Sequence, residues 1–291
     1  MKGERLGAAS DLGDFALLGI AATADSWEVK VEVPAGARWF DGHFPGHPIL
    51  PAVAQLALVD RLLRRLAGPG RTTALDRFRL PLPVAPGDRL AVALARPDAA
   101  GRAAFTLRRG TAVVSGGTGE WTPLGPAPAA GAAPAGVAPA TDPAAGATAE
   151  VAGLLPHRGP ALLARRIVER DAGGLLCAGT IPPASPLAEG ADGAFPAFAA
   201  VELAAQAAGL HEILRTAGAG GAAPSLGYLV RIRAAAFAAA DLPAGSPLLA
   251  RVDREAGAPP LALYRFDVAI AGARIAQSSL GTYAAGSGRG E

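Results

Sequence analysis

A run of alanine, proline and glycine in the middle of the chain constrains the fold more than any other feature. Of the 27 residues from 123 to 149, 22 belong to these three types, and the run has no hydrophobic periodicity. Its six prolines break the helix that its alanines would otherwise favour. Such a segment is typical of an extended linker. The sequence therefore predicts two folded units, 1–122 and 150–291, joined by a linker over 123–149.

The two halves present the same order of signals. In the first, the alternating stretch SWEVKVEVPA predicts a strand, a helix is expected over 53–67, and β-rich stretches follow. In the second, the strand-like GGLLCAGTIPP precedes a helix that ends near Gly218, again followed by β-rich stretches. The tight turn at 85–88 has a counterpart at 243–246. Each half is thus expected to be an α+β unit, a curled antiparallel sheet wrapped around one long helix.

Composition excludes several classes of function. A net charge of +2 without strong clustering argues against nucleic acid as a partner. The single cysteine, Cys177, excludes an internal disulfide, and the four histidines lack metal-ligand spacing, so no metal or organic cofactor is expected. No apolar run is long enough to span a membrane, and the first residues do not read as a signal peptide. These observations favour a cytoplasmic protein.

Four stretches resemble one known family. GHFPGHPILPAV (42–53) resembles the active-site loop of the 3-hydroxyacyl-[acyl-carrier-protein] dehydratases, which have the hot-dog fold. LLPHRGPALLARRIVER (154–170) is similar to the opening segment of those enzymes, and FPAFAAVELAAQAAG (195–209) is similar to their central helix. The segment LDRFRLPLPVAPGDRL (75–90) resembles the strand pair that follows that helix. The resemblance implies a double hot dog, similar to the paired dehydratase subunits of aryl-polyene-type assembly lines.

Counting along the family motif divides the catalytic residues between the halves. In the family, the acid of the helix lies 14 positions after the loop histidine, and each site takes its histidine and its acid from different subunits. Fourteen positions after His43 the chain has Ala57, and 14 positions before Glu202 it has Ala188. The first unit therefore has a base without an acid, and the second an acid without a base. If the units pair as an intramolecular pseudo-dimer, His43 and Glu202 complete one site, and Ala57 and Ala188 mark a degenerate one.

The resemblance gives four residues a role in removing water from a 3-hydroxyacyl thioester to give a trans-2-enoyl thioester. His43 takes the proton next to the thioester carbonyl. Glu202 protonates the leaving hydroxyl, and its apolar neighbours are expected to raise its pKa for that purpose. The N–H of Ala52, where the family has glycine, faces the thioester oxygen. Gln206, one helical turn after Glu202, orients the carboxyl group.

The other three histidines have simpler interpretations. His47 is expected to be an exposed loop residue, His157 a structural residue near the sheet, and His211 a core or interface residue. Cys177 is expected to be a small buried side chain in a strand.

The resemblance also implies an acyl-carrier protein as partner, which presents an acidic surface. The first half has 15 lysines and arginines against 12 acidic residues, which favours docking there, near Arg38, Arg64 and Arg65. Further association of two pseudo-dimers stays open. Two alternatives also stay open: a hot-dog thioesterase, which shares the helix carboxylate but does not need His43, and a non-catalytic acyl-binding partner of an assembly line.

Overall fold

The computed structural model describes residues 12–123, 148–188, 193–218, 226–238 and 241–285. The linker expected over 123–149 lies almost wholly outside these ranges, so its character and the unit boundaries beside it stay predictions. No helix in the described part of the chain is long and apolar enough to cross a membrane.

The first half contains six strands and one long helix. They are β1 (Ala16–Ala22), β2 (Ser26–Glu32), a 3-10 turn (Arg38–Phe40), α1 (Ala52–Ala67), β3 (Gly70–Arg79), β4 (Arg89–Ala95), β5 (Arg102–Arg109) and β6 (Ala112–Pro123). The strand expected in SWEVKVEVPA is β2, whose alternate residues Trp27, Val29 and Val31 are buried. The helix expected over 53–67 is α1, which ends at Gly68 with a positive φ of 103°. Strand β1 was not expected, because ALLGIAA lacks polar alternation.

The second half repeats this plan around α3. Its elements are α2 (Ala149–Leu154), a 3-10 turn (Gly159–Ala161), β7 (Ala164–Arg170), β8 (Gly174–Gly179), β9 (Ala194–Phe195), a 3-10 turn (Ala197–Ala199), α3 (Ala200–Gly218), β10 (Leu226–Ile232), β11 (Ala235–Phe237), β12 (Leu242–Pro243), β13 (Leu248–Ala256), β14 (Leu261–Ile270) and β15 (Ala273–Ala285). The matching turns are confirmed: Gly87 and Gly245 have φ of 83° and 81°. Cys177 is buried in β8, as expected.

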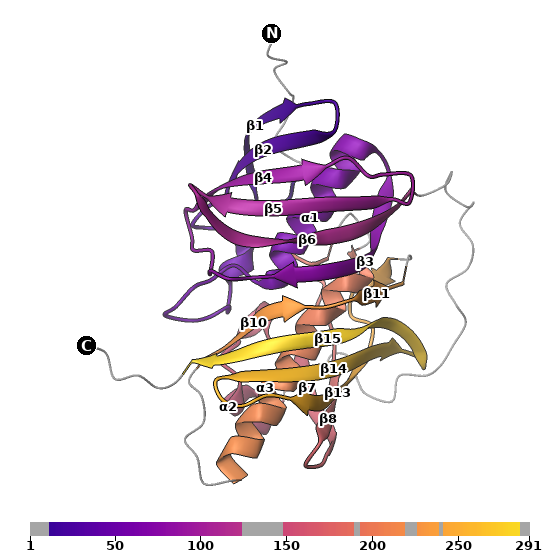
Figure 1. The fold of residues 1–291 in the computed structure, drawn as a ribbon. Coiled ribbons are helices and arrows are strands. Elements are labelled where there is room, and N and C mark those ends of the chain that lie inside the picture. Colours follow the sequence, from indigo (N-terminus) through magenta and orange to yellow (C-terminus); the bar gives the residue numbers. More distant parts are fainter. Residues whose placement is uncertain (1–11, 124–147, 189–192, 219–225, 239–240, 286–291) are drawn as a thin grey trace.

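One antiparallel sheet of 13 strands runs through both halves, in the order β1-β2-β4-β5-β6-β3-β10-β15-β14-β13-β8-β7, with β11 pairing with β3 and β15. Figure 1 shows the first-half strands lying over α1 and the second-half strands over α3. The halves join where β3 pairs with β10, with Arg79 opposite Arg231 and Phe78 opposite Ile232. This continuous sheet, with a helix behind each half, is the double hot-dog fold that the sequence predicted.

Arg61 on α1 makes a second contact between the halves. The Arg61 side chain is largely buried; its guanidinium donates to the carbonyl of Leu12 at 3.2 Å and to that of Pro186, in the second half, at 3.3 Å. It also lies 5.7 Å from the centre of the Trp39 ring. Buried carbonyl groups that lose such donors are left without partners.

Replacing Arg61 should therefore destabilise the protein. Arg61→Ala is expected to lower the free energy of unfolding by about 1 to 3 kcal/mol, because two carbonyl groups lose a charged donor. Urea denaturation followed by circular dichroism measures this. The control is Arg77→Ala, since the Arg77 side chain is 70% exposed and its ion pair with Asp76 is a surface pair. Equal stability of the two variants would show that the Arg61 contacts contribute nothing.

Candidate active site

The loop that precedes α1 holds His43 in one orientation. The backbone closes on itself, with the N–H of His47 bonded to the carbonyl of Phe44 at 3.0 Å and the N–H of Ile49 bonded to that of His43 at 3.2 Å. The Nδ1 atom of His43 lies 2.9 Å from the Ile49 carbonyl oxygen, which can only accept, so Nδ1 carries the proton. Nε2 is then left with its lone pair. His47 itself is exposed, as expected.

Gly42 brings this loop against the second half. It has a φ of 85°, and a Cβ atom there would lie 1.8 Å from the carbonyl oxygen of Arg158. The Arg158 N–H donates to the Gly42 carbonyl at 3.0 Å. Glycine is required at this position both by the backbone conformation and by the close approach. The contact places His157, the neighbour of Arg158, beside the His43 loop.

The first turns of α3 carry Glu202 and Gln206, both buried. Gln206 is fixed by four contacts: its Oε1 accepts from the N–H groups of Leu163 and Ala164, and its Nε2 donates to the Ala161 carbonyl at 2.7 Å and to Oε1 of Glu202 at 3.1 Å. The amide group therefore links the carboxyl group of Glu202 to the 161–164 segment. This is the geometry expected of a residue that orients the carboxyl group.

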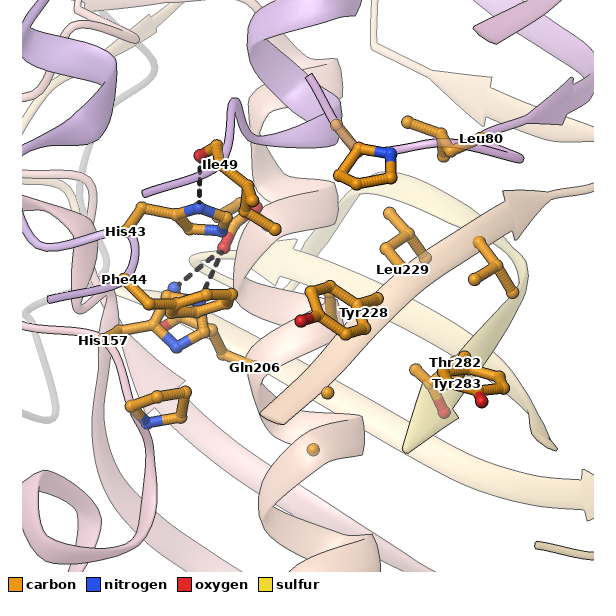
Figure 2. Close-up of a pocket in the computed structure, with 18 of the residues that line it drawn as sticks. His43, Phe44, Ile49, Leu80, His157, Gln206, Tyr228, Leu229, Thr282 and Tyr283 are labelled. Atoms are coloured by element: carbon orange, nitrogen blue, oxygen red, sulfur yellow. Dashed lines mark hydrogen bonds and ion pairs between the residues drawn. The ribbon is translucent and has the colours of Figure 1, made fainter. Parts of the chain in front are cut away.

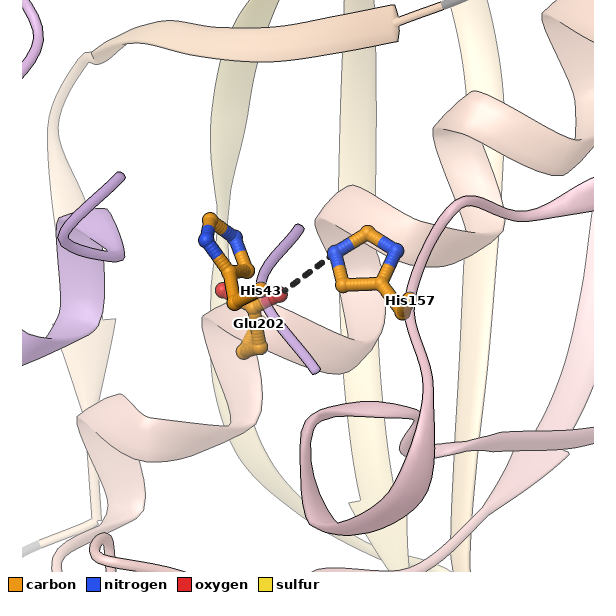
Figure 3. Close-up of side chains that lie close together, drawn as sticks. All are labelled: His43, His157 and Glu202. Carbon is orange, nitrogen blue, oxygen red and sulfur yellow. Dashed lines mark ion pairs between the residues drawn. The ribbon is translucent and has the colours of Figure 1, made fainter. Parts of the chain in front are cut away.

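His43 and Glu202 meet, although 158 positions separate them in the sequence. One ligand atom each from His43, His157 and Glu202 lie within 4.8 Å of one another, and all three side chains are buried (Figure 3). The residues come from the loop before α1, the loop after α2 and the first turn of α3. The structure thus brings together His43 and Glu202, which come from different halves of the sequence.

His157 does not have the position expected of it. It was expected to be a structural residue near the sheet, but its Nε2 lies 3.4 Å from Oε1 of Glu202. Its ring packs edge-on against Phe44, with centroids 4.8 Å apart, and lies 5.1 Å from the ring of His43. No local spacing could have indicated this, because His157 precedes Glu202 by 45 positions. His211, by contrast, is a core residue bonded to the Tyr264 hydroxyl at 2.9 Å.

Burial keeps His43 neutral. Removal from water lowers the pKa of His43 to about 4, the nearby Glu202 carboxylate opposes that shift, and His157 adds to it. At neutral pH the imidazole is therefore unprotonated at Nε2. A neutral imidazole with a fixed tautomer is suited to act as a base.

Glu202 departs from expectation. Burial favours its neutral form, but this effect is outweighed by the hydrogen bond from His157, the charges of His43 and His157, and the hydrogen bond from Gln206. Together they lower the pKa of Glu202 to about 2, so the carboxyl group is ionised at neutral pH. The expectation of a raised pKa was wrong because it considered only the apolar neighbours along α3.

A cavity of about 420 Å³ opens beside these residues. Figure 2 shows His43, Phe44 and His157 at one end and Thr282 and Tyr283 at the other. Most of its walls are apolar, as in pockets for acyl or other small-molecule ligands.

Ala52 lines the same cavity and is the first residue of α1, where a backbone N–H has no partner within the helix. Among the described residues only Arg77 and Ala271 have a positive φ without being glycine. Alanine is therefore compatible with the backbone at position 52, where the resemblance has glycine.

The positions of the expected degenerate site are now visible. Ala57 is buried on α1, and Ala188 follows a turn that starts near Ser185. Arg61 lies four positions after Ala57, as Gln206 lies four positions after Glu202. Its guanidinium reaches the carbonyl of Pro186, two positions before Ala188. Neither alanine can exchange a proton, and a guanidinium bridges the two segments that a second site would use.

Two imidazoles and a carboxylate form a donor set that zinc accepts. In this cluster, however, both His157 and Gln206 direct N–H groups at Oε1 of Glu202, and Nδ1 of His43 is bonded to Ile49. A metal ion bound to Nε2 of His157 and to Oε1 of Glu202 would have to break the 3.4 Å contact between these two atoms, although Nε2 of His43 and Oε2 of Glu202 are not used by the contacts named here. We assign no metal to the cluster.

Two family models match the chain. Residues 20–118 match the ApeI-like family, described as ApeI dehydratase, and residues 149–287 match the ApeP-like family, described as ApeP dehydratase. Together the two ranges cover more than four-fifths of the chain. No curated protein sequence matches.

Solved dehydratase structures show the same fold. The dehydratase domain of PpsC from Mycobacterium tuberculosis, in complex with C12:1-CoA, aligns with a TM-score of 0.62 and 15% identity over 92% of this chain and 97% of that one. The dehydratase domain of RzxB from Pseudomonas fluorescens aligns with a TM-score of 0.61 and 14% identity over 91% and 97%. The dehydratase domain of a mycocerosic acid synthase-like polyketide synthase aligns with a TM-score of 0.61 and 14% identity over 98% and 99%.

With one unit of each type on a double hot-dog scaffold, the chain belongs to the ApeI-like and ApeP-like dehydratases, fused here into a single polypeptide.

Proposed function

We propose that the protein removes water from a 3-hydroxyacyl thioester, delivered by an acyl-carrier protein, to give a trans-2-enoyl thioester. The observation that carries this proposal is the meeting of His43 from the first unit with Glu202 from the second, at one end of a largely apolar cavity. The cavity would hold the acyl chain. Each unit supplies only half of the chemistry, so the chain has one composite site.

Nε2 of His43 takes the proton from the carbon next to the thioester carbonyl, and Nδ1–H stays bonded to Ile49. Negative charge then grows on the thioester oxygen, where the free N–H of Ala52 stabilises it. The ionised Glu202 accepts a hydrogen bond from the 3-hydroxyl group and stabilises the imidazolium that forms on His43. As the C–O bond breaks and the double bond forms, the imidazolium gives its proton to the leaving hydroxyl, which departs as water.

This mechanism replaces the acid role expected for Glu202. A carboxyl group with a pKa of about 2 has no proton to give at neutral pH. The proton that His43 has just taken is available on the same side of the substrate. The enzyme returns to its starting protonation state without exchange with solvent.

A smaller cavity of about 30 Å³ reaches His43 and Glu202 from another side and is lined by Arg38, Trp39 and Asp41. Arg38 is 56% exposed and pairs with Asp14 at 3.0 Å. This supports a docking surface near Arg38, whereas Arg64 is drawn to the buried Asp60.

Single replacements at either half of the site should abolish activity. His43→Gln and Glu202→Gln are each expected to lower kcat/KM by about two to four orders of magnitude, because the proton acceptor or the hydroxyl-orienting charge is lost. Hydration of a 2-enoyl thioester, followed by loss of its ultraviolet absorbance, measures this. His47→Ala is the matched control, since His47 lies exposed in the same loop. Full activity in either Gln variant would disprove the composite site.

The same assay separates the alternatives. Release of free thiol from acyl thioesters, without enoyl formation, would identify a thioesterase. Binding of acyl thioesters with neither reaction would identify a non-catalytic partner. The proposed dehydratase interconverts the 3-hydroxyacyl and 2-enoyl forms and releases no thiol.

The pH dependence of the reaction should report the lowered pKa of His43. The base works unprotonated, so kcat/KM is lost as pH falls through the pKa of His43, which is about 4. Between about pH 5 and 8 the profile should be flat, whereas a histidine with the ordinary pKa of about 6.5 would lose activity across that range. Initial rates at constant ionic strength measure this. An inflection near 6.5 would contradict a buried, neutral His43.

Activity should not depend on a metal ion. Treatment with EDTA and gel filtration is expected to leave the rate unchanged, because His43 and Glu202 supply the acid–base chemistry themselves. Loss of activity that zinc restores would overturn the assignment of the cluster to hydrogen bonds.

A further inference from the structure

His157 lies within the cluster, although neither the motif count nor the mechanism above uses it. Its side chain is 7% exposed and lines the large cavity. Phe44 packs against its ring, and the bond between the Arg158 N–H and the Gly42 carbonyl fixes the backbone beside it. The loop before α1 in the opposite unit therefore fixes the orientation of the His157 ring.

The two carboxylate oxygens of Glu202 have different numbers of hydrogen-bond donors around them. His157 Nε2 at 3.4 Å and Gln206 Nε2 at 3.1 Å both approach Oε1, and no donor from the described residues lies within hydrogen-bond distance of Oε2. A carboxylate held in this way presents its second oxygen to whatever enters the cavity. One oxygen therefore orients the group, and the other is left for a ligand.

We propose that His157 is a positioning residue that acts through Glu202: its Nε2–H engages Oε1, so that Oε2 alone meets the substrate hydroxyl. This inference rests on the proposed function, since the substrate hydroxyl belongs to it. It adds a third side chain, His157, to the pair His43 and Glu202 that the sequence predicted.

The tautomer follows from the contacts. Oε1 of an ionised carboxylate only accepts, so the His157 nitrogen that faces it carries a proton. Nδ1 of His157 is buried without a hydrogen-bond partner among the described residues. The proton on Nε2 of His157 therefore faces Glu202. Nδ1 of His157 is left for a water molecule or a bound ligand.

The surrounding charges leave His157 and Gln206 as the groups that stabilise the carboxylate in the resting site. His43 faces Glu202 from the loop before α1, but it is neutral at neutral pH. Arg158, beside His157, directs its guanidinium to the carbonyls of Leu155 and His157. Glu212, further along α3, is bonded to Arg215 and Tyr264. The hydrogen bond from His157 is the largest effect that favours the carboxylate, so removal of His157 changes the electrostatics of Glu202 more than removal of Gln206 does.

Burial determines the direction in which the pKa of Glu202 moves when His157 is removed. His157 provides the largest of the effects that oppose removal from water; without it only the charge of His43 and the smaller Gln206 hydrogen bond remain, and the pKa of Glu202 rises. A protonated carboxyl group neither accepts the hydroxyl hydrogen bond as strongly nor stabilises an imidazolium on His43. Activity should then fall at neutral pH and recover as pH rises, because ionisation is restored.

Three variants test this. His157→Phe keeps an aromatic ring against Phe44 but has no N–H group, whereas His157→Gln keeps an N–H donor without a titrating ring. His211→Gln is the matched control, a buried histidine of the same unit outside the cavity. Circular dichroism checks that each variant folds.

In the enoyl hydration assay, His157→Phe is expected to lower kcat about 100-fold at pH 7 with little change in KM, as misplacement of a catalytic group does. Its kcat should rise between pH 7 and pH 9, while the wild-type profile is flat there. His157→Gln should retain about a tenth or more of the activity. A His157→Phe profile that superimposes on the wild type, or a loss that no pH restores, would overturn the proposal.

A second measurement does not need activity. In protein labelled with [δ-¹³C]glutamate, the Glu202 resonance is the one missing from Glu202→Gln. It should show no titration above about pH 4.3 in the wild type, and in His157→Phe it should titrate between about pH 7 and 9, the range in which kcat recovers. An unchanged resonance in the variant would refute the inference even if the wild type proves to be no dehydratase. A shifted resonance with no hydration activity in the wild type would refute only the proposed function.

Discussion

The site depends on the close contact between the two units. Strand β3 pairs with β10 to make one sheet, and Gly42 brings the His43 loop to within a hydrogen bond of Arg158. A side chain at position 42 would collide with the Arg158 carbonyl and push the loop away from α3. Because His43 and Glu202 come from opposite sides of this contact, a small separation of the units would move the two side chains apart.

Much of this arrangement could be predicted from local sequence patterns. The alternation in β2, the apolar length of α1 and the glycine turns at 87 and 245 depend on neighbours in sequence, and all are present. The count of 14 positions from His43 to Ala57, and back from Glu202 to Ala188, assigns the loop histidine to the first unit and the helix carboxylate to the second. Once the units pair, that count predicts which two side chains face each other.

The rest could not be predicted, because it depends on contacts between distant segments. Strand β1 pairs with β2 through its backbone, which its side-chain pattern does not reveal. His157 reaches Glu202 only because the loop after α2 folds over α3. The protonation of Glu202 shows the same limitation: its sequence neighbours are apolar and favour the neutral acid, but donors from His157 and Gln206 outweigh them.

A single site also changes what the rest of the pseudo-dimer can do. A second copy of the pair would bury another carboxylate, which is costly unless donors surround it. Because positions 57 and 188 are alanines, no donors are needed there for a buried carboxylate. The position one helical turn after Ala57 is occupied by Arg61, whereas the matching position after Glu202 is occupied by Gln206. Arg61 donates to Leu12 and Pro186, so the segments near Ala57 and Ala188 help to hold the two units together. The contact between the units that brings His43 to Glu202 is therefore supported from the side of the pseudo-dimer where alanine occupies both matching positions.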